Sequence, residues 1–183
     1  MKVIDLPIAG LKLIEPDVFG DERGFFMETW QAARYREHGI DAPFVQDNLS
    51  RSSKGVLRGL HFQNPNPQGK LVQCLEGEVF DVAVDIRKGS PTFGKWHGEM
   101  LSDRNRRQFW VPAGFAHGYC VLSASALFHY KCTTNYDPDS EHAIRYDDAD
   151  IGIDWPLGGE PPRVSDKDRA ASRISETPSL ILF

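Results

Sequence analysis

A cation, two glycines and a histidine lie close together in the segment Gly55–Gln63. Arg58 and His61 are the residues of this segment that could bind or activate an anionic small molecule, and Lys70 begins the next apolar stretch. Side chains alternate between the two faces of a strand, so residues three positions apart point to opposite faces. We therefore predict a β-bulge at Gly59, which would bring Arg58 and His61 into one cavity.

His61 taken alone has two other interpretations. A histidine in an apolar strand is more often a satisfied polar side chain than a catalyst. Small β-barrels also bind metal ions through two or three histidines on adjacent strands. His61 has no second histidine two positions away, and His117 could approach only from another strand, without a carboxylate in register. The residues therefore favour a site without metal.

Other polar residues are ambiguous from their positions alone. His117 follows the tight turn in Trp110–Tyr119, which reads as a hairpin with a buried aromatic side chain. Tyr130 and Tyr136 fit a barrel that packs its tyrosine rings and points their hydroxyl groups at solvent. The run Ser165–Asp168 has the composition of a solvated charged surface. None of these positions predicts a chemistry by itself.

The chain around these residues is organised in short strands. Glu78–Ile86 is the clearest, because Phe80, Val82, Val84 and Ile86 recur at period two and predict one apolar face. Similar runs predict strands at Phe44–Arg51, Gly55–Gln63, Lys70–Leu75, Trp96–Leu101, Arg107–Val111, His117–Leu122 and Ala126–Thr133. Turn-forming Pro, Gly and Asn residues separate them at the spacing of a sandwich or barrel. We therefore predict an all-β fold.

Helix is expected only at the periphery. Thr29–His38 reads as a helix, with Thr29 as its N-cap and Gly39 as its C′ residue. The tail Ile151–Phe183 is rich in Pro, Gly and charge, and we expect it to pack outside the barrel with one helical turn near Asp166–Ser172. Residues 1–183 have the length of a single domain.

Composition limits the classes of function. The net charge of -5 comes from acids and bases spread along the chain, which argues against nonspecific nucleic-acid binding. No apolar run has transmembrane length, and Met1–Pro16 lacks the pattern of a signal peptide. The 3 cysteines stand singly, without the spacing of a zinc site or a disulfide framework. We expect a cytoplasmic protein with no membrane and no nucleic-acid partner.

Several motifs match a known family in the same order along the chain. They are Phe19–Phe26, Val45–Asn48, Gly55–Gln63, Gln68–Val72, Gly77–Arg87, Ser90–Gly94, Trp110–Gly118 and Ser165–Asp168. Through them the sequence resembles the dTDP-4-dehydrorhamnose 3,5-epimerases over nearly its whole length.

The resemblance implies a cupin-type jelly-roll β-barrel with a few short peripheral helices. It implies a homodimer in which an N-terminal segment of one subunit reaches into its partner's pocket. The activity that it implies is a metal-independent isomerase with no cofactor. The reaction would be epimerisation of dTDP-4-dehydro-6-deoxy-D-glucose at C3 and C5 to dTDP-4-dehydro-L-rhamnose, in dTDP-L-rhamnose biosynthesis.

The resemblance also assigns roles to individual residues. His61 matches the family's base, and Asp168 matches the carboxylate that orients it. Lys70 matches the cation beside the C4 oxygen, and Tyr130 matches the acid on the opposite face of the sugar. Substrate-binding positions are matched by Arg23, Phe26 and Glu28 of the N-terminal segment, and by Gln46, Asp47, Asn48, Arg58, His117, Tyr136, Glu141 and Lys167, with Tyr136 as the ring near thymine.

These residue types suit proton transfer beside a ketone. The protons at C3 and C5 are acidic because the C4 ketone accepts the charge as an enolate, so the reaction needs a base and a partner for that oxygen. Inversion also needs a proton from the opposite face of the ring. A carboxylate such as Asp168 would fix the tautomer of His61, and arginines suit the geometry of a diphosphate.

Two departures from the family and three alternatives remain open. The family commonly has two adjacent tyrosines where this chain has Asn135 and Tyr136, and many relatives have a third aromatic residue in place of Met27. A related epimerase acting at one carbon would share the same base and acid. A metal-dependent cupin would need more ligands than His61 and His117. A sugar-binding barrel without catalysis would not exchange the substrate's protons with solvent.

Overall fold

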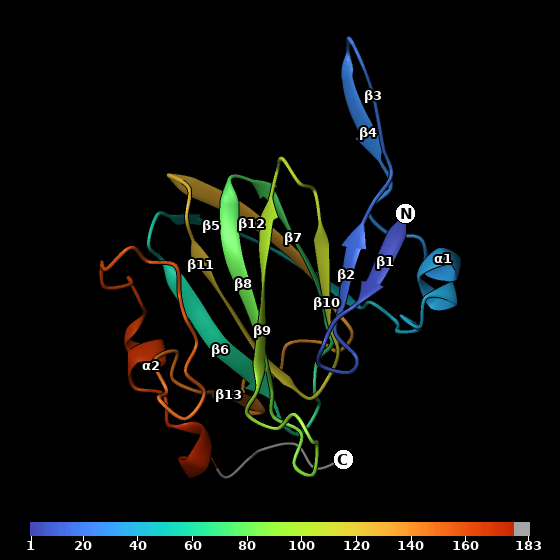
Figure 1. Ribbon diagram of the computed structural model, residues 1–183. Helices are drawn as coiled ribbons and strands as arrows, with labels where there is room; N and C mark the ends of the chain where they lie inside the picture. Colours follow the sequence, from blue (N-terminus) through green and yellow to red (C-terminus); the bar gives the residue numbers. More distant parts are fainter. Residues whose placement is uncertain (178–183) are drawn as a thin grey trace.

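Two antiparallel β-sheets face each other in the computed structural model, which describes residues 1–177 (Figure 1). The strands are β1 (Lys2–Asp5), β2 (Lys12–Glu15), β3 (Val18–Asp21), β4 (Gly24–Met27), β5 (Gln46–Ser53), β6 (Leu57–Gln63), β7 (Lys70–Glu76), β8 (Glu78–Asp85), β9 (Trp96–Ser102), β10 (Gln108–Val111), β11 (Phe115–Val121), β12 (Ser125–Cys132) and β13 (Glu141–Ala143). The six-stranded sheet has the order β1-β2-β10-β7-β12-β5, and the five-stranded sheet has the order β13-β6-β11-β8-β9. This is the jelly roll that the resemblance predicts.

The space between the sheets is filled mainly by apolar side chains. Val72 and Phe128 of the six-stranded sheet pack there with Ala83 and Tyr119 of the five-stranded sheet. β8 therefore buries both of its faces, because Val82 on its other face belongs to a second apolar cluster. The predicted apolar face of this strand is confirmed, but the opposite face is also buried and carries two aspartates into the barrel.

Each sheet is covered on its outside by a different part of the chain. Ile144, Ile151 and Ile174 of the C-terminal part pack with Val82 and other residues of the five-stranded sheet. On the six-stranded sheet, Tyr35 and neighbouring residues pack on Leu71 and Trp110. The expected packing of the tail outside the barrel is confirmed for its described residues, while residues 178–183 lie outside the described range.

The helices are short and peripheral. Helix α1 (Ala32–Glu37) begins later than predicted: Gln31 is its N-cap and accepts the N–H of Arg34. Thr29 lies too far before Ala32 to be the cap, and its carbonyl instead accepts a hydrogen bond from the Tyr35 hydroxyl (3.0 Å). Gly39 is confirmed beyond the helix end, with a φ of 79°.

The C-terminal part of the described chain contributes two further helical turns. These are α2 (Asp166–Arg169), where a turn was predicted, and the 3₁₀ turn η1 (Ile174–Glu176). No helix within residues 1–177 is both long and apolar enough to cross a membrane.

Every strand predicted from the alternation of apolar residues is present, with ends shifted by a few residues. The prediction missed β1 to β4 and β13, which have only 3 or 4 residues each. β3 and β4 form a separate hairpin that projects away from the barrel (Figure 1). Its strands are exposed along almost their whole length, so no alternation of buried and exposed positions marks them in the sequence.

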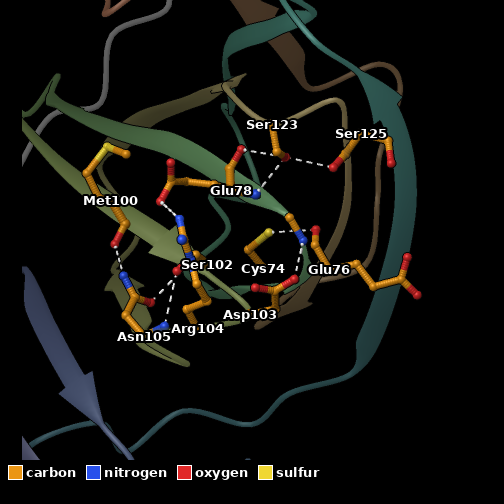
Figure 2. Close-up of polar contacts among 11 residues, drawn as sticks. Cys74, Glu76, Glu78, Met100, Ser102, Asp103, Arg104, Asn105, Ser123 and Ser125 are labelled. Atoms are coloured by element: carbon orange, nitrogen blue, oxygen red, sulfur yellow. Dashed lines mark hydrogen bonds and ion pairs between the residues drawn. The ribbon is translucent and has the colours of Figure 1, made fainter.

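A cluster of polar contacts joins loops at one end of the barrel (Figure 2). The Gly77 N–H donates to Asp103 Oδ2 (2.7 Å), and the Glu78 N–H donates to Ser123 Oγ (2.8 Å). The pairing register places this cluster beyond Glu76 of β7, while Lys70 pairs with Cys132 at the other end of the same strand. Lys70 and Cys132 therefore mark the opposite end of the barrel.

Asp85, at the end of β8, holds the following loop in place. Its fully buried carboxylate accepts hydrogen bonds from Arg87 Nε (2.8 Å), Ser90 Oγ (2.6 Å) and Thr92 Oγ1 (2.6 Å). Burial opposes the charged form, but these donors outweigh it and lower the pKa of Asp85 to about 2. The carboxylate is therefore ionised wherever the protein is folded near neutral pH.

We predict that Asp85→Asn lowers the free energy of unfolding by roughly 2 kcal/mol at neutral pH, since the folded-state pKa lies below the unfolded one. The contribution is complete above the unfolded pKa of about 4 and is lost as the pH falls towards the folded value. Urea unfolding of both proteins at neutral pH and at about pH 3 measures it. A stability difference that does not shrink at the acidic pH would contradict this account.

Candidate active site

β6 contains the bulge predicted at Gly59. On the neighbouring strand β11, His117 pairs with His61 and Tyr119 pairs with Arg58. Two steps along β11 therefore correspond to three steps along β6, which thus contains one extra residue. Gly59 has a φ of 117°, in the region that favours glycine. Because of the extra residue, the side chains of Arg58 and His61 point to the same face of the strand, and both line one hollow in the barrel.

Two glycines allow the backbones to approach at the bulge. A Cβ atom on Gly59 would lie 2.6 Å from the Cα of Gly118, and one on Gly118 would lie 2.6 Å from the carbonyl oxygen of Arg58. Both distances are shorter than any normal contact with a Cβ atom. The bulge therefore depends on the absence of side chains at two positions on neighbouring strands.

His61 is bonded to a carboxylate from the C-terminal tail. Its Nε2 lies 2.6 Å from Asp168 Oδ1, and the side chains are 30% and 4% exposed respectively. Ser165 caps α2 by accepting the Asp168 N–H (3.1 Å), which fixes the backbone of this residue. The run Ser165–Asp168 is thus not a solvated charged surface throughout.

Asp168 remains ionised despite its burial. Burial by itself raises the pKa of a carboxyl group, but hydrogen bonds from His61 and from the backbone of Gly59 outweigh it and lower the pKa of Asp168 below its usual value. The bulge therefore also supplies a backbone donor to the partner of His61.

Two hollows meet at His61. The first, of about 210 Å³, is named the Gln46 hollow and is lined by Gln46, Asn48, His61, Phe62, Gln63, Gln68, Lys70, Tyr130, Cys132, Tyr136 and Glu141. The second, also of about 210 Å³, is named the His117 hollow and is lined by Ser50, Arg58, His61, Lys70, His117, Gly118, Tyr119, Phe128 and Tyr130. Three residues border both: His61, Lys70 and Tyr130.

These three residues come from opposite walls. His61 lies on β6 of the five-stranded sheet, whereas Lys70 and Tyr130 lie on β7 and β12 of the six-stranded sheet. Burial raises the pKa of Tyr130 to about 12, so its hydroxyl keeps its proton at neutral pH. Burial lowers the pKa of Lys70, although the charges of Asp81 and Glu141 counter part of this effect.

His117 has a carboxylate partner that the sequence did not reveal. Its Nε2 lies 2.8 Å from Oδ1 and 3.0 Å from Oδ2 of Asp81, and both residues are buried. The expectation that no carboxylate lies in register with His117 is therefore wrong. Asp81 lies on the inward face of β8, next to β11, where the sequence showed only its alternation with apolar residues.

The open side of the Gln46 hollow is held by a chain of polar contacts. The Tyr136 N–H donates to Gln46 Oε1 (2.7 Å), and the Tyr136 hydroxyl donates to Glu141 Oε2 (2.7 Å). Lys167 forms an ion pair with the same Glu141 oxygen. Burial favours the neutral form of Glu141, but the bonds from Lys167 and Tyr136 outweigh it and lower the pKa of Glu141. Tyr136 thus presents a half-exposed ring beside a carboxylate and a cation.

Five of the expected binding residues line neither hollow: Arg23, Phe26, Glu28, Asp47 and Lys167. Asp47 is on the outward side of β5, where its carboxylate binds Lys131 Nζ (2.8 Å). Arg23 lies in the β3–β4 hairpin with its side chain 85% exposed, and Phe26 is 69% exposed. Glu28 follows the hairpin and binds Arg34 Nη1 (3.0 Å). Lys167 reaches the Gln46 hollow only through its ion pair with Glu141, and the structure brings none of the other four side chains to the site of their own chain.

Some side chains in the hollows were not predicted from the sequence: Ser50, Gln63, Gln68, Tyr119 and Cys132. A signal existed for four of them. Ser50, Gln63, Tyr119 and Cys132 each lie two positions after a predicted residue of the same strand, so strand alternation places each on the face of that residue. The hydroxyl groups of Ser50 and Tyr119 lie 2.9 Å apart and bond to each other across the barrel.

Known proteins share this architecture. The family model described as dTDP-4-dehydrorhamnose 3,5-epimerase matches residues 5–176. The dTDP-4-dehydrorhamnose 3,5-epimerase of Methanothermobacter thermautotrophicus is 52% identical over 178 residues, covering 97% of this chain and 96% of that protein. The protein of the same name from Shigella flexneri is 56% identical over 170 residues, covering 92% of this chain and 93% of that protein.

A solved structure agrees throughout the chain. The dTDP-6-deoxy-D-glucose-3,5-epimerase of Legionella pneumophila, in complex with dTDP-4-keto-L-rhamnose, matches with a TM-score of 0.97 at 58% identity, covering 100% of this chain and 98% of that chain. The matched family model and these identities leave no ambiguity about descent. The chain belongs to the dTDP-4-dehydrorhamnose 3,5-epimerase family.

Proposed function

We propose that this protein epimerises dTDP-4-dehydro-6-deoxy-D-glucose at C3 and C5 to give dTDP-4-dehydro-L-rhamnose, a reaction of dTDP-L-rhamnose biosynthesis. The observation that carries the proposal is the pair His61–Asp168, located where two hollows meet and where Lys70 and Tyr130 also border the space. The Legionella pneumophila relative, which holds dTDP-4-keto-L-rhamnose, supports the substrate class.

His61 is the base of the proposed reaction. Its Nε2 faces Asp168, so the negative charge of Asp168 stabilises the imidazolium that forms when the ring accepts a proton from carbon. Lys70 borders both hollows and meets the oxygen at C4, where the enolate charge develops. The base and the cation come from different sheets, so the sugar ring lies between them.

Tyr130 is the acid that completes inversion. Its hydroxyl keeps its proton because burial raises its pKa to about 12, and it projects from the wall opposite His61. A proton removed on the His61 side and returned from the Tyr130 side inverts the carbon. The same arrangement serves C3 and C5 if the ring presents each carbon in turn.

We predict that His61→Asn lowers kcat at least about 100-fold, since a positioned general base contributes roughly that much or more. Turnover of dTDP-4-dehydro-6-deoxy-D-glucose measures the effect, and unfolding in urea shows whether the variant is folded. Asp168→Asn is the matched variant, because it keeps the shape of the dyad and removes its charge. Near-normal turnover by a folded His61→Asn protein would refute the assignment.

We predict that Tyr130→Phe separates proton exchange from inversion. His61 would still abstract protons, so deuterium from D₂O should enter C3 and C5, while product formation falls at least about 100-fold without the acid. Proton NMR of the substrate in D₂O follows both events in one sample. Loss of exchange and inversion to the same extent would place Tyr130 outside the acid role.

The same NMR experiment on the unmodified protein tests the alternatives. Exchange at both carbons is the expected result. Exchange at only one carbon would identify a single-site epimerase, and exchange at neither would leave a binding protein without this activity.

The dimer is part of the proposal. The β3–β4 hairpin projects from its own barrel and exposes Phe19, Phe25 and Phe26, which a folded chain normally covers. Arg23 at its tip lines neither the Gln46 hollow nor the His117 hollow of its own chain. We place this hairpin at the pocket of a second copy, where Arg23, Phe26 and Glu28 would contact the nucleotide.

We predict that two inactive variants complement each other when mixed. Arg23→Ala leaves its own His61 intact, and His61→Asn leaves its own hairpin intact, so a mixed dimer has one complete site. Random pairing of subunits after unfolding and refolding should restore about a quarter of the normal activity. Activity that stays at the sum of the two separate variants would show that each chain builds its site alone.

Metal independence and a cytoplasmic location complete the proposal. Nε2 of His61 and Nε2 of His117 each bond to a carboxylate, and among residues 1–177 no three His, Cys, Asp or Glu side chains gather in a group that could hold a metal ion. Metal analysis of the active protein tests this point.

The cysteines support the proposed cytoplasmic location. Cys74, Cys120 and Cys132 are free and buried, which suits a reducing compartment.

A further inference from the structure

Asp81 is a buried carboxylate that has no role in the sequence analysis or in the proposed reaction. It is 0% exposed and lies on the inward face of β8, between Val79 and Ala83 of the apolar interior. Its partner is His117, whose Nε2 lies within 3.0 Å of both carboxylate oxygens. An unpaired charge in such surroundings is strongly unfavourable, so this pair accounts for the presence of the carboxylate.

The contact fixes which nitrogen of His117 carries a proton. Two carboxylate oxygens converge on Nε2, so this atom donates a hydrogen bond and Nδ1 is left as the other nitrogen. Nδ1 has no hydrogen bond to another residue of the described part of the chain. The ring lies nearly parallel to Phe128, with ring centroids 6.4 Å apart, and lines the His117 hollow.

Several charged or titratable side chains surround this ring. The His117 hollow is lined by Arg58 and His61 on β6, Lys70 on β7, Tyr130 on β12, and Tyr119 on β11, the strand of His117. Two of these are permanent or usual cations, Arg58 and Lys70, and both oppose a further positive charge on His117. Asp81 on β8 is the bonded carboxylate that favours it: burial raises the pKa of Asp81, and the contacts with His117 and the charge of Lys70 counter that effect.

We propose that Asp81 is a positioning residue that acts through His117. Its carboxylate holds the ring by accepting the Nε2 proton, and its negative charge stabilises the ring when Nδ1 is also protonated. Nδ1 then donates a hydrogen bond to an anionic oxygen of the substrate. His117 then adds a charged donor to Arg58 and Lys70 in the same hollow. This inference rests on the proposed function for the identity of the anion, which is either the diphosphate or the enolate oxygen.

Asp81→Asn tests the proposal, since the amide oxygen still accepts the Nε2 proton while the charge is removed. Loss of a charged hydrogen bond to substrate should reduce kcat/KM about 10- to 100-fold at pH 8. The loss should be smaller at pH 6, where a neutral ring can still be protonated, so the basic limb of the pH profile should move to lower pH. A loss in KM alone would indicate the diphosphate, and a loss in kcat would indicate the enolate oxygen.

Asp85→Asn is the matched control. It removes a second buried carboxylate from the same face of β8, but Asp85 holds a loop and does not border either hollow. Its pH profile should keep the normal shape. An equal loss at every pH in Asp81→Asn would reduce Asp81 to a structural role and overturn the proposal.

Nitrogen-15 NMR of the histidine rings gives a readout that needs no turnover. With inorganic diphosphate bound, both nitrogens of His117 should be protonated in the unmodified protein at neutral pH, and only one in Asp81→Asn. This result is independent of the reaction, so it stands even if the proposed substrate is wrong. If Asp81→Asn does not fold, His117→Gln should abolish the basic limb, and an unchanged limb in that variant would refute the inference.

Discussion

The bulge at Gly59 is the constraint on which the site depends. Without the extra residue, Arg58 and His61 would point to opposite faces of β6, and one of them would be lost from the barrel interior. The same bulge gives Asp168 a backbone donor from Gly59, which helps to keep that carboxylate ionised. It is possible only because Gly118 on β11 also lacks a side chain, so two glycines on different strands together allow one local geometry.

Pairing of buried polar groups governs the rest of the interior. A jelly roll of this size has an apolar core, and a charge placed in it must meet an opposite charge or several donors. His61 with Asp168 and His117 with Asp81 meet this requirement by direct bonds. Burial keeps the proton on Tyr130, so the barrel that excludes water also maintains the protonation state that the acid requires.

Covering layers complete the site from outside the barrel. Ile144, Ile151 and Ile174 hold the C-terminal part of the chain on the outward face of the five-stranded sheet, and this packing brings Asp168 beside β6. The carboxylate is 107 residues from His61 in the sequence. Hydrophobic packing of the tail therefore sets the geometry of a polar pair.

The sequence by itself determined the strands with alternating apolar residues, the bulge and the family, because periodicity, glycine chemistry and ordered motifs are local properties. It also indicated His61 and Lys70 as candidates from their own segments, and the resemblance supplied the roles of His61, Lys70 and Tyr130. Alternation could not reveal the short strands β1 to β4. It does place Asp47 on the opposite face of its strand from Gln46 and Asn48, but only the structure shows that this carboxylate binds Lys131. The resemblance indicated Asp168 as the partner of His61, but only the tertiary structure revealed Asp81 as the partner of His117, since Asp81 reaches it from a neighbouring strand. A hydrogen bond of this kind requires two groups to lie close together in space, and the number of residues between them along the chain does not predict whether they do.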